Sequence, residues 1–327
     1  NYPTGTNNVA LGDTALDSGS LSGGNNTAIG NAALTVNTSG VDNTAVGDLS
    51  LDANTTGGRN TAIGRVSLSS NTTGGDNVSI GRSALTSNST GCKNVAVGYG
   101  ALLSNTEAND NIAVGYQSLE QNTTGTSNIA VGCGALESNT TASDNVAMGK
   151  RALGGTTTGC RNTAMGRAAM NGNSTGDTNV AVGYSALYSN TTADNNTAVG
   201  SQALCTNTTG AHNVAVGARA GDANTTGTQN TFVGGDYNGG PGGANTTGGC
   251  NTFIGNDSGM KNTTGSFSTS VGAESSCNGT TSHSNAALGY KALKLLTTGN
   301  HNVAIGREAM ISNTTGTRNT GIGAYAL

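Results

Sequence analysis

Asn43-Thr44-Ala45-Val46-Gly47, followed after a short gap by Asn54-Thr55-Thr56-Gly57, is the stretch that decides the fold. Versions of this unit recur along the whole chain of 327 residues. The copies start every 17 residues, except for one interval of 18 and one of 21, at residues 8, 26, 43, 60, 77, 94, 111, 128, 145, 162, 179, 196, 213, 230, 251, 268, 285, 302 and 319. Such regularity is typical of a solenoid or fibre. We number the positions of each copy 1 to 17 from the residue equivalent to Asn43.

Composition limits both the core and the classes of partner. The chain contains 53 Gly and no Trp, with 3% aromatic and 10% charged residues, so its core must be thin and repetitive. A net charge of -4 offers no basic stripe for nucleic acid, and no run of 18 apolar residues could insert into a membrane. The chain begins with neither Met nor a signal peptide, so we expect a processed chain or part of a longer one.

Two positions are expected to form the core. Position 4 is apolar in every copy, and position 9 is Leu or Met in fifteen copies. The core is therefore predicted to contain Val46, Ile63 and Val97 at position 4 and Leu51, Leu68 and Leu102 at position 9. Position 5 is Gly in every copy, and this indicates a positive φ or a backbone approach too close for a Cβ atom, as at Gly47, Gly64 and Gly98.

These patterns predict an all-β fold, a parallel β-solenoid (β-roll or β-helix) of about 19 coils with 17 residues each. Position 3 is mostly Ala and should face away from position 4, because neighbouring residues of a strand point to opposite sides. A small apolar residue such as Ala45 suggests that another backbone packs there. Two large side chains per coil cannot offset the entropy of ordering the coil, so we expect further chains to contribute, as in a homotrimeric fibre.

The Asn-Thr-Thr-Gly of positions 12 to 15 is turn chemistry and is expected on the outside of the coil. Every Lys, Arg, Asp and Glu except Glu107 falls at position 6, 7, 10, 11, 16 or 17, so these positions should face water. Many turns are also Asn-x-Thr sequons, in which the Asn is either a glycosylation acceptor or locked into a ladder of stacked Asn residues. The candidates for glycosylation are Asn54, Asn71, Asn122 and Asn224.

The pattern weakens between residues 213 and 284, which divides the chain into regular repeats 1–212, irregular repeats 213–284 and regular repeats 285–327. Four consecutive copies lack Leu at position 9, and a Gly-rich insertion lies within residues 234–243. Phe232 and Phe253 replace Ala at position 3 on either side of it. Either the Phe rings fill the space of the missing Leu, or Phe232, Phe253, Asp236, Tyr237 and Pro241 belong to a loop that binds a receptor.

The remaining reactive residues predict little chemistry. Six Cys are expected to be free thiols or partners of Cys residues in other chains, because cysteines that share a position lie several coils apart. The three His are isolated from Cys and carboxylates at metal-ligand spacing, so no metal or cofactor is expected. Tyr99 and Tyr116 share position 6 on adjacent coils and predict an aromatic ladder or a stacking platform for sugars. Nothing in the spacing favours an enzyme.

The repeat resembles two families. Asn94-Val95-Ala96-Val97-Gly98 and the residues after it look like the head repeats of trimeric autotransporter adhesins. The Asn-Thr-Ala-Val-Gly and Asn-Thr-Thr-Gly units are closer still to repeats of phage tail-fibre-like proteins. The resemblance covers nearly the whole chain. It implies parallel coils, three identical chains and a role in surface attachment.

Several functions are consistent with such a repeat. The first is a structural and adhesive fibre, on a cell surface or a virion, that binds itself and a receptor or glycan on the host or another cell. The second is an extracellular filament whose subunits stack end to end. A third is an ice-binding solenoid, suggested by the Thr-Thr pairs. We expect neither nucleic-acid binding nor membrane insertion.

Overall fold

The computed structural model describes residues 6–235 and 240–327. The chain divides into two compact units, Asn1–Arg161 and Asn162–Leu327. The irregular repeats 213–284 lie inside the second unit. In the described residues both units consist of three-residue strands joined by turns, without helices. The first unit contains β1 (Val9–Leu11), β2 (Thr27–Ile29), β3 (Thr44–Val46), β4 (Thr61–Ile63), β5 (Val78–Ile80), β6 (Val95–Val97), β7 (Ile112–Val114), β8 (Ile129–Val131) and β9 (Val146–Met148).

The second unit repeats the same design. Its strands are β10 (Thr163–Met165), β11 (Val180–Val182), β12 (Thr197–Val199), β13 (Val214–Val216), β14 (Thr231–Val233), β15 (Thr252–Ile254), β16 (Thr269–Val271), β17 (Ala286–Leu288), β18 (Val303–Ile305) and β19 (Thr320–Ile322).

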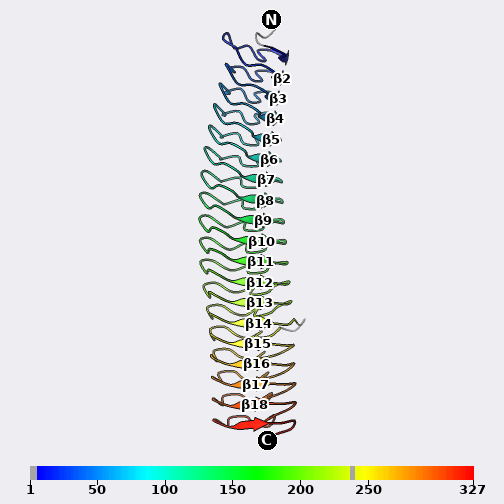
Figure 1. Cartoon of the computed structure of the whole chain (residues 1–327), viewed down its shortest axis with the longest axis vertical. Helices are drawn as coiled ribbons and strands as arrows, with labels where there is room; N and C mark the ends of the chain where they lie inside the picture. Colours follow the sequence, from blue (N-terminus) through cyan, green and yellow to red (C-terminus); the bar gives the residue numbers. More distant parts are fainter. Residues whose placement is uncertain (1–5, 236–239) are drawn as a thin grey trace. The chain divides into compact units, whose positions relative to one another are not determined.

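Each unit is a parallel β-solenoid, as the period predicts. Every strand pairs in parallel with the next strand of its unit, so the coils stack one on another (Figure 1). The register advances by one repeat, as from Ala45 to Ala62 between β3 and β4. The insertion does not disturb this register, because Phe232 of β14 still pairs with Phe253 of β15.

The interior of the coil contains the Ala face of the strand. Ala45 at position 3 and Leu51 at position 9 are both fully buried. Leu68 and Leu102 are buried in the same way, which confirms position 9 as core. The expectation that Ala45 marks a contact between chains is wrong, because its methyl group faces its own Leu row. The coil is so narrow that position 3 has room for little more than a methyl group in a regular repeat.

Position 4 is correspondingly outside the coil, contrary to its assignment to the core. Ile63 keeps 39% of its surface exposed, and Val46 and Val97 are half-buried. Alternation along a three-residue strand explains the error: once position 3 points inward, positions 2 and 4 must point outward. Both faces of the strand are apolar, so polarity alone does not reveal which one is buried.

Two ladders of Asn side chains line the interior at positions 1 and 12. Asn43 donates from its backbone N and from Nδ2 to Oδ1 of Asn26, at 3.0 and 3.1 Å. Asn54 donates from Nδ2 to Oδ1 of Asn37 at 2.9 Å. Nδ2 of both Asn43 and Asn54 also donates to the carbonyl oxygen of Gly57. The prediction that position 12 lies on an outer turn is therefore wrong for the Asn, whose amide ties adjacent coils together from within.

The tight coil requires unusual backbone angles. Gly47 has φ 139°, and a Cβ added to it would lie 2.5 Å from the carbonyl oxygen of Gly64 in the next coil. Both reasons predicted for Gly at position 5 are thereby confirmed. Positions 7, 9 and 17 also take positive φ, although most of their residues are not Gly, as at Val66 (58°), Leu51 (54°) and Arg59 (58°). An L-residue pays about 1–2 kcal/mol for this left-handed conformation.

Candidate functional site

The outward face of the strands holds most of the exposed aliphatic side chains of each unit. Positions 2 and 4 are free of charged residues in every copy. Within regular coils many of the aliphatic side chains at these positions keep more than a third of their surface exposed, and others, such as Val46 and Val97, are half-buried. Those of the first unit include Ile29, Ile63, Ile80, Ile112, Val114 and Met148, and those of the second include Met165, Val199, Val214, Val216, Leu288 and Ile305. A contiguous apolar surface of this kind is more often covered by an interaction partner than left exposed to solvent.

A row of polar and aromatic side chains at position 6 borders this face. In the first unit, Asp48 forms an ion pair with Arg65, with 3.3 Å between Oδ2 and Nε. Hydrogen bonds from Asn31 and Arg65 lower the pKa of Asp48. Both partners of the ion pair are well exposed, and exposed pairs add little stability. The position 6 row therefore determines the polarity of the surface and contributes little to the free energy of unfolding.

Tyr99 and Tyr116 form the predicted aromatic ladder. Their rings stack with centroids 5.4 Å apart and planes 14° from parallel. The guanidinium of Arg82 lies 5.8 Å from the centroid of the Tyr99 ring. Stacking along the row uses the faces of the rings, whereas a sugar platform must present a ring face to solvent. The geometry thus favours a ladder over a platform.

Phe232 and Phe253 lie in the core and not in an exposed loop. They are 0% and 2% exposed, with ring centroids 6.0 Å apart. A Cβ added at position 9 would collide with these rings. At Gly221, in the coil before Phe232, it would meet the Phe232 ring, and at Gly259, in the coil of Phe253, it would meet the Phe253 ring. The Phe rings therefore occupy the space of the missing Leu side chains, which confirms the space-filling interpretation.

The remaining members of the predicted binding loop do not form a visible site. Pro241 is buried, and its carbonyl oxygen accepts a hydrogen bond from the backbone N of Gly221 at 3.0 Å. Asp236 and Tyr237 lie outside the described residues. The part of the insertion that the structure describes is thus packed against the neighbouring coil.

The predicted glycosylation sites are buried. Asn54, Asn71, Asn122 and Asn224 are each 0% exposed, and each donates from Nδ2 to the Asn of the preceding coil. The folded chain therefore does not present these amides to a glycosyltransferase, and the ladder alternative holds. Among the turn Thr residues, Thr55 donates its hydroxyl to the carbonyl oxygen of Thr72, whereas Thr56 is exposed. Only one of the two Thr rows is thus free to meet solvent, which argues against a two-row ice-binding array.

Other reactive groups are dispersed. None of the six Cys, all of which lie among the described residues, forms a disulfide within the chain. Burial raises the pKa of the Cys205 and Cys277 thiols, which makes them poor nucleophiles. Across residues 6–235 and 240–327 there is no group of three His, Cys, Asp or Glu side chains that could hold a metal ion. The same residues include no helix of the length and apolarity needed to cross a membrane.

Comparison with known proteins does not extend this description. No protein-family model matches the chain, and none of the curated proteins matches it significantly.

Proposed function

We propose that this chain is part of an extracellular structural and adhesive fibre, on a cell surface or a virion, whose chains associate as homotrimers. One observation carries the proposal: position 4, on the outward face of the strands, is aliphatic in every copy, and its side chains are exposed or half-buried. The resemblance to adhesin-head and tail-fibre repeats supports the same conclusion.

The geometry of the apolar row favours a second copy of the chain as its partner. Successive side chains such as Ile80, Val97 and Val114 lie on successive coils, which are about 4.8 Å apart in a stacked sheet. A partner that packs along such a row needs apolar groups at the same spacing, and another copy has them. The absence of charge from positions 2 and 4 removes the repulsion that would oppose such a contact. This assigns the chain contact to positions 2 and 4 instead of position 3.

Attachment would then be a property of the assembled fibre. The inner positions are devoted to packing and hydrogen-bonded ladders, so a receptor or glycan on another cell can meet only the outward positions. The Arg82–Tyr99–Tyr116 row and the exposed Thr row are the surfaces available in the first unit.

Light scattering of the purified chain tests the association. We expect a trimer that dissociates when charge is placed on the apolar row, in a double variant with Val97→Asp and Val114→Asp. A control with Thr90→Asp and Thr124→Asp adds the same charge at exposed position 14 and should stay trimeric. A wild-type chain that is monomeric at all concentrations contradicts the proposal, and indefinite fibres in electron micrographs would favour the filament hypothesis. Attachment is tested by binding of the fluorescent trimer to glycan arrays and candidate host cells, and absence of binding would leave only a structural role.

A further inference from the structure

One coil of the second unit has lost nearly all the residues that fill the interior elsewhere. A regular coil places Asn, Ala, Leu, Asn and Gly at the inner positions 1, 3, 9, 12 and 15. The coil 268–284 has Ser268, Ser270, Ser276, Gly279 and Ser282 at these positions. The substitutions remove an aliphatic side chain and two amides from one cross-section of the solenoid. Four of the five inner positions hold a Ser hydroxyl instead, and Gly279 has no side chain.

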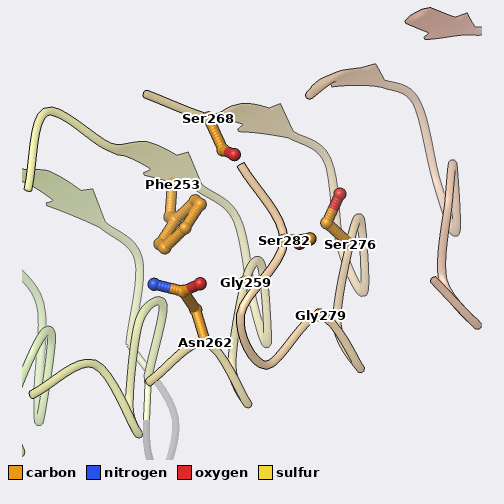
Figure 2. Close-up of a pocket in the computed structure, with 7 residues that line it drawn as sticks. All are labelled: Phe253, Gly259, Asn262, Ser268, Ser276, Gly279 and Ser282. Carbon is orange, nitrogen blue, oxygen red and sulfur yellow. The ribbon is translucent and has the colours of Figure 1, made fainter. Parts of the chain in front are cut away.

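These changes leave a small cavity. It is lined by seven residues from two successive coils, with the Phe253 ring on one side (Figure 2): Phe253, Gly259, Asn262, Ser268, Ser276, Gly279 and Ser282. The volume open to the centre of a water-sized sphere is about 10 Å³. This is close to the minimum that holds a single water molecule.

One polar atom of the cavity lacks a hydrogen-bond partner, and another lacks the donor that it has in a regular coil. Ser276 is only 6% exposed, and its Oγ is buried without a hydrogen bond. In a regular coil, Nδ2 of the next Asn in the ladder donates to the position 12 Oδ1, as Asn71 does to Asn54 at 2.9 Å. Asn262 has no equivalent donor for its Oδ1, because Gly279 occupies position 12 of the following coil. A buried polar group without a partner costs about 1–3 kcal/mol, so the Ser276 hydroxyl favours a guest that can form a hydrogen bond with it. Asn262 Oδ1 offers the same guest an acceptor.

We infer that this cavity is a binding site for one structural water molecule. The water donates to Asn262 Oδ1, in place of the missing Asn amide, and accepts from Ser276 Oγ. The hydroxyl groups of Ser268 and Ser282 lie on the same wall and offer further partners. A buried water typically makes about three hydrogen bonds, and this lining can supply them. An apolar guest is excluded because it would leave Ser276 Oγ unpaired, and any larger guest is excluded by the volume.

A high-resolution crystal structure of the whole chain tests the site directly. The expected result is a fully occupied water within hydrogen-bond distance of Ser276 Oγ and Asn262 Oδ1. An empty cavity, or a Ser276 hydroxyl turned to a backbone carbonyl with no water present, overturns the inference.

Water-oxygen magnetic relaxation dispersion provides a second measurement in solution, where it counts long-lived internal waters. Gly279→Asn restores the ladder donor and should remove one such water relative to wild type. Thr281→Asn makes a comparable change at an exposed position of the same coil and should leave the number unchanged. An unchanged number in Gly279→Asn, with the variant folded by circular dichroism, contradicts the site. Ser276→Ala adds a stability test: the water site predicts a lower unfolding midpoint, whereas a dry cavity predicts a higher one.

Discussion

The buried Asn ladder makes a prediction that separates its structural role from a role in glycosylation. Asn54 and Thr56 belong to the same sequon, so replacing either one by Ala abolishes it. Only Asn54 takes part in the interior. Its side chain donates to Asn37 Oδ1 and to the carbonyl oxygen of Gly57, and its own Oδ1 accepts from Asn71, at 2.9, 3.0 and 2.9 Å.

The cost of Asn54→Ala follows from these contacts. Three hydrogen bonds are lost, and Asn37 Oδ1 is left buried without a donor. The Gly57 carbonyl keeps the bond from Asn43. At about 1 kcal/mol per bond, with a further penalty of about 1–3 kcal/mol for the orphaned acceptor, the variant should lose about 4–6 kcal/mol. Thr56→Ala removes an exposed side chain and should stay within about 0.5 kcal/mol of wild type.

Urea unfolding followed by far-UV circular dichroism measures both variants, and hydrogen exchange of the amides in residues 43–59 reports local opening of this coil. Expression in a host that does not glycosylate removes any contribution of a glycan. The reasoning is refuted if Asn54→Ala unfolds within 0.5 kcal/mol of wild type, or if Thr56→Ala costs as much as Asn54→Ala.

Three further predictions concern backbone strain, burial of charge and the turn glycines. Val66→Asn should stabilise the chain by about 1 kcal/mol in thermal unfolding, because Asn tolerates the left-handed φ of 58° better than a β-branched residue. Gly100→Val, at the equivalent position of its coil, should destabilise the chain by about 1–2 kcal/mol, although an added Cβ meets no atom within 3.5 Å. If Val66→Asn and Gly100→Val were both as stable as wild type, the proposed backbone strain at position 7 would be contradicted. Burial raises the pKa of Asp52, so its charge destabilises the fold increasingly as pH rises above the ordinary value of 3.8, and Asp52→Asn should raise the unfolding midpoint at pH 7 and lose this advantage in acid. The pKa of Asp76 is lowered by its bond to Arg59, so Asp76→Asn should show the opposite trend, and matching pH profiles for the two variants would refute the assignment. Gly47→Ala should cost more than about 3 kcal/mol in urea unfolding because of its φ and the clash with the next coil, and a smaller loss would show that the coils separate easily.

The sequence predicts the period, the parallel solenoid, the Leu row and the Gly row, because each depends on a pattern that recurs without ambiguity. It does not show which face of the strand is buried, since Ala45 and Val46 are both apolar. A signal was nevertheless present: position 3 is small in the regular copies, as expected of a crowded interior, while position 4 varies among Val, Ile, Leu and Met.

The sequence wrongly predicts the Asn of position 12 to lie on the outside of the coil, for a different reason. Asn beside Thr and Gly has the composition of a turn, and the backbone there does turn, yet the amide points inward. Positions 1 and 12 contain no charged residue in any copy, and this is the feature that distinguishes them from the solvent-facing positions. No feature of the sequence predicts the left-handed conformation of Leu51. Leu does not favour this conformation, and tertiary packing imposes it.

The orientation of the strand is the central claim, and paired Asp variants at adjacent positions measure it most directly. Ala96 is fully buried, whereas Val97 is half-buried and faces outward. In urea unfolding of the dilute, monomeric chain, Ala96→Asp should abolish the cooperative transition or cost more than about 4 kcal/mol, because a carboxylate cannot be buried unpaired in the Leu row. Val97→Asp should fold and lose about 1 kcal/mol, the range of strand propensities on an exposed face. The reverse result, a folded Ala96→Asp and an unfolded Val97→Asp, would contradict the account and put position 4 back in the core.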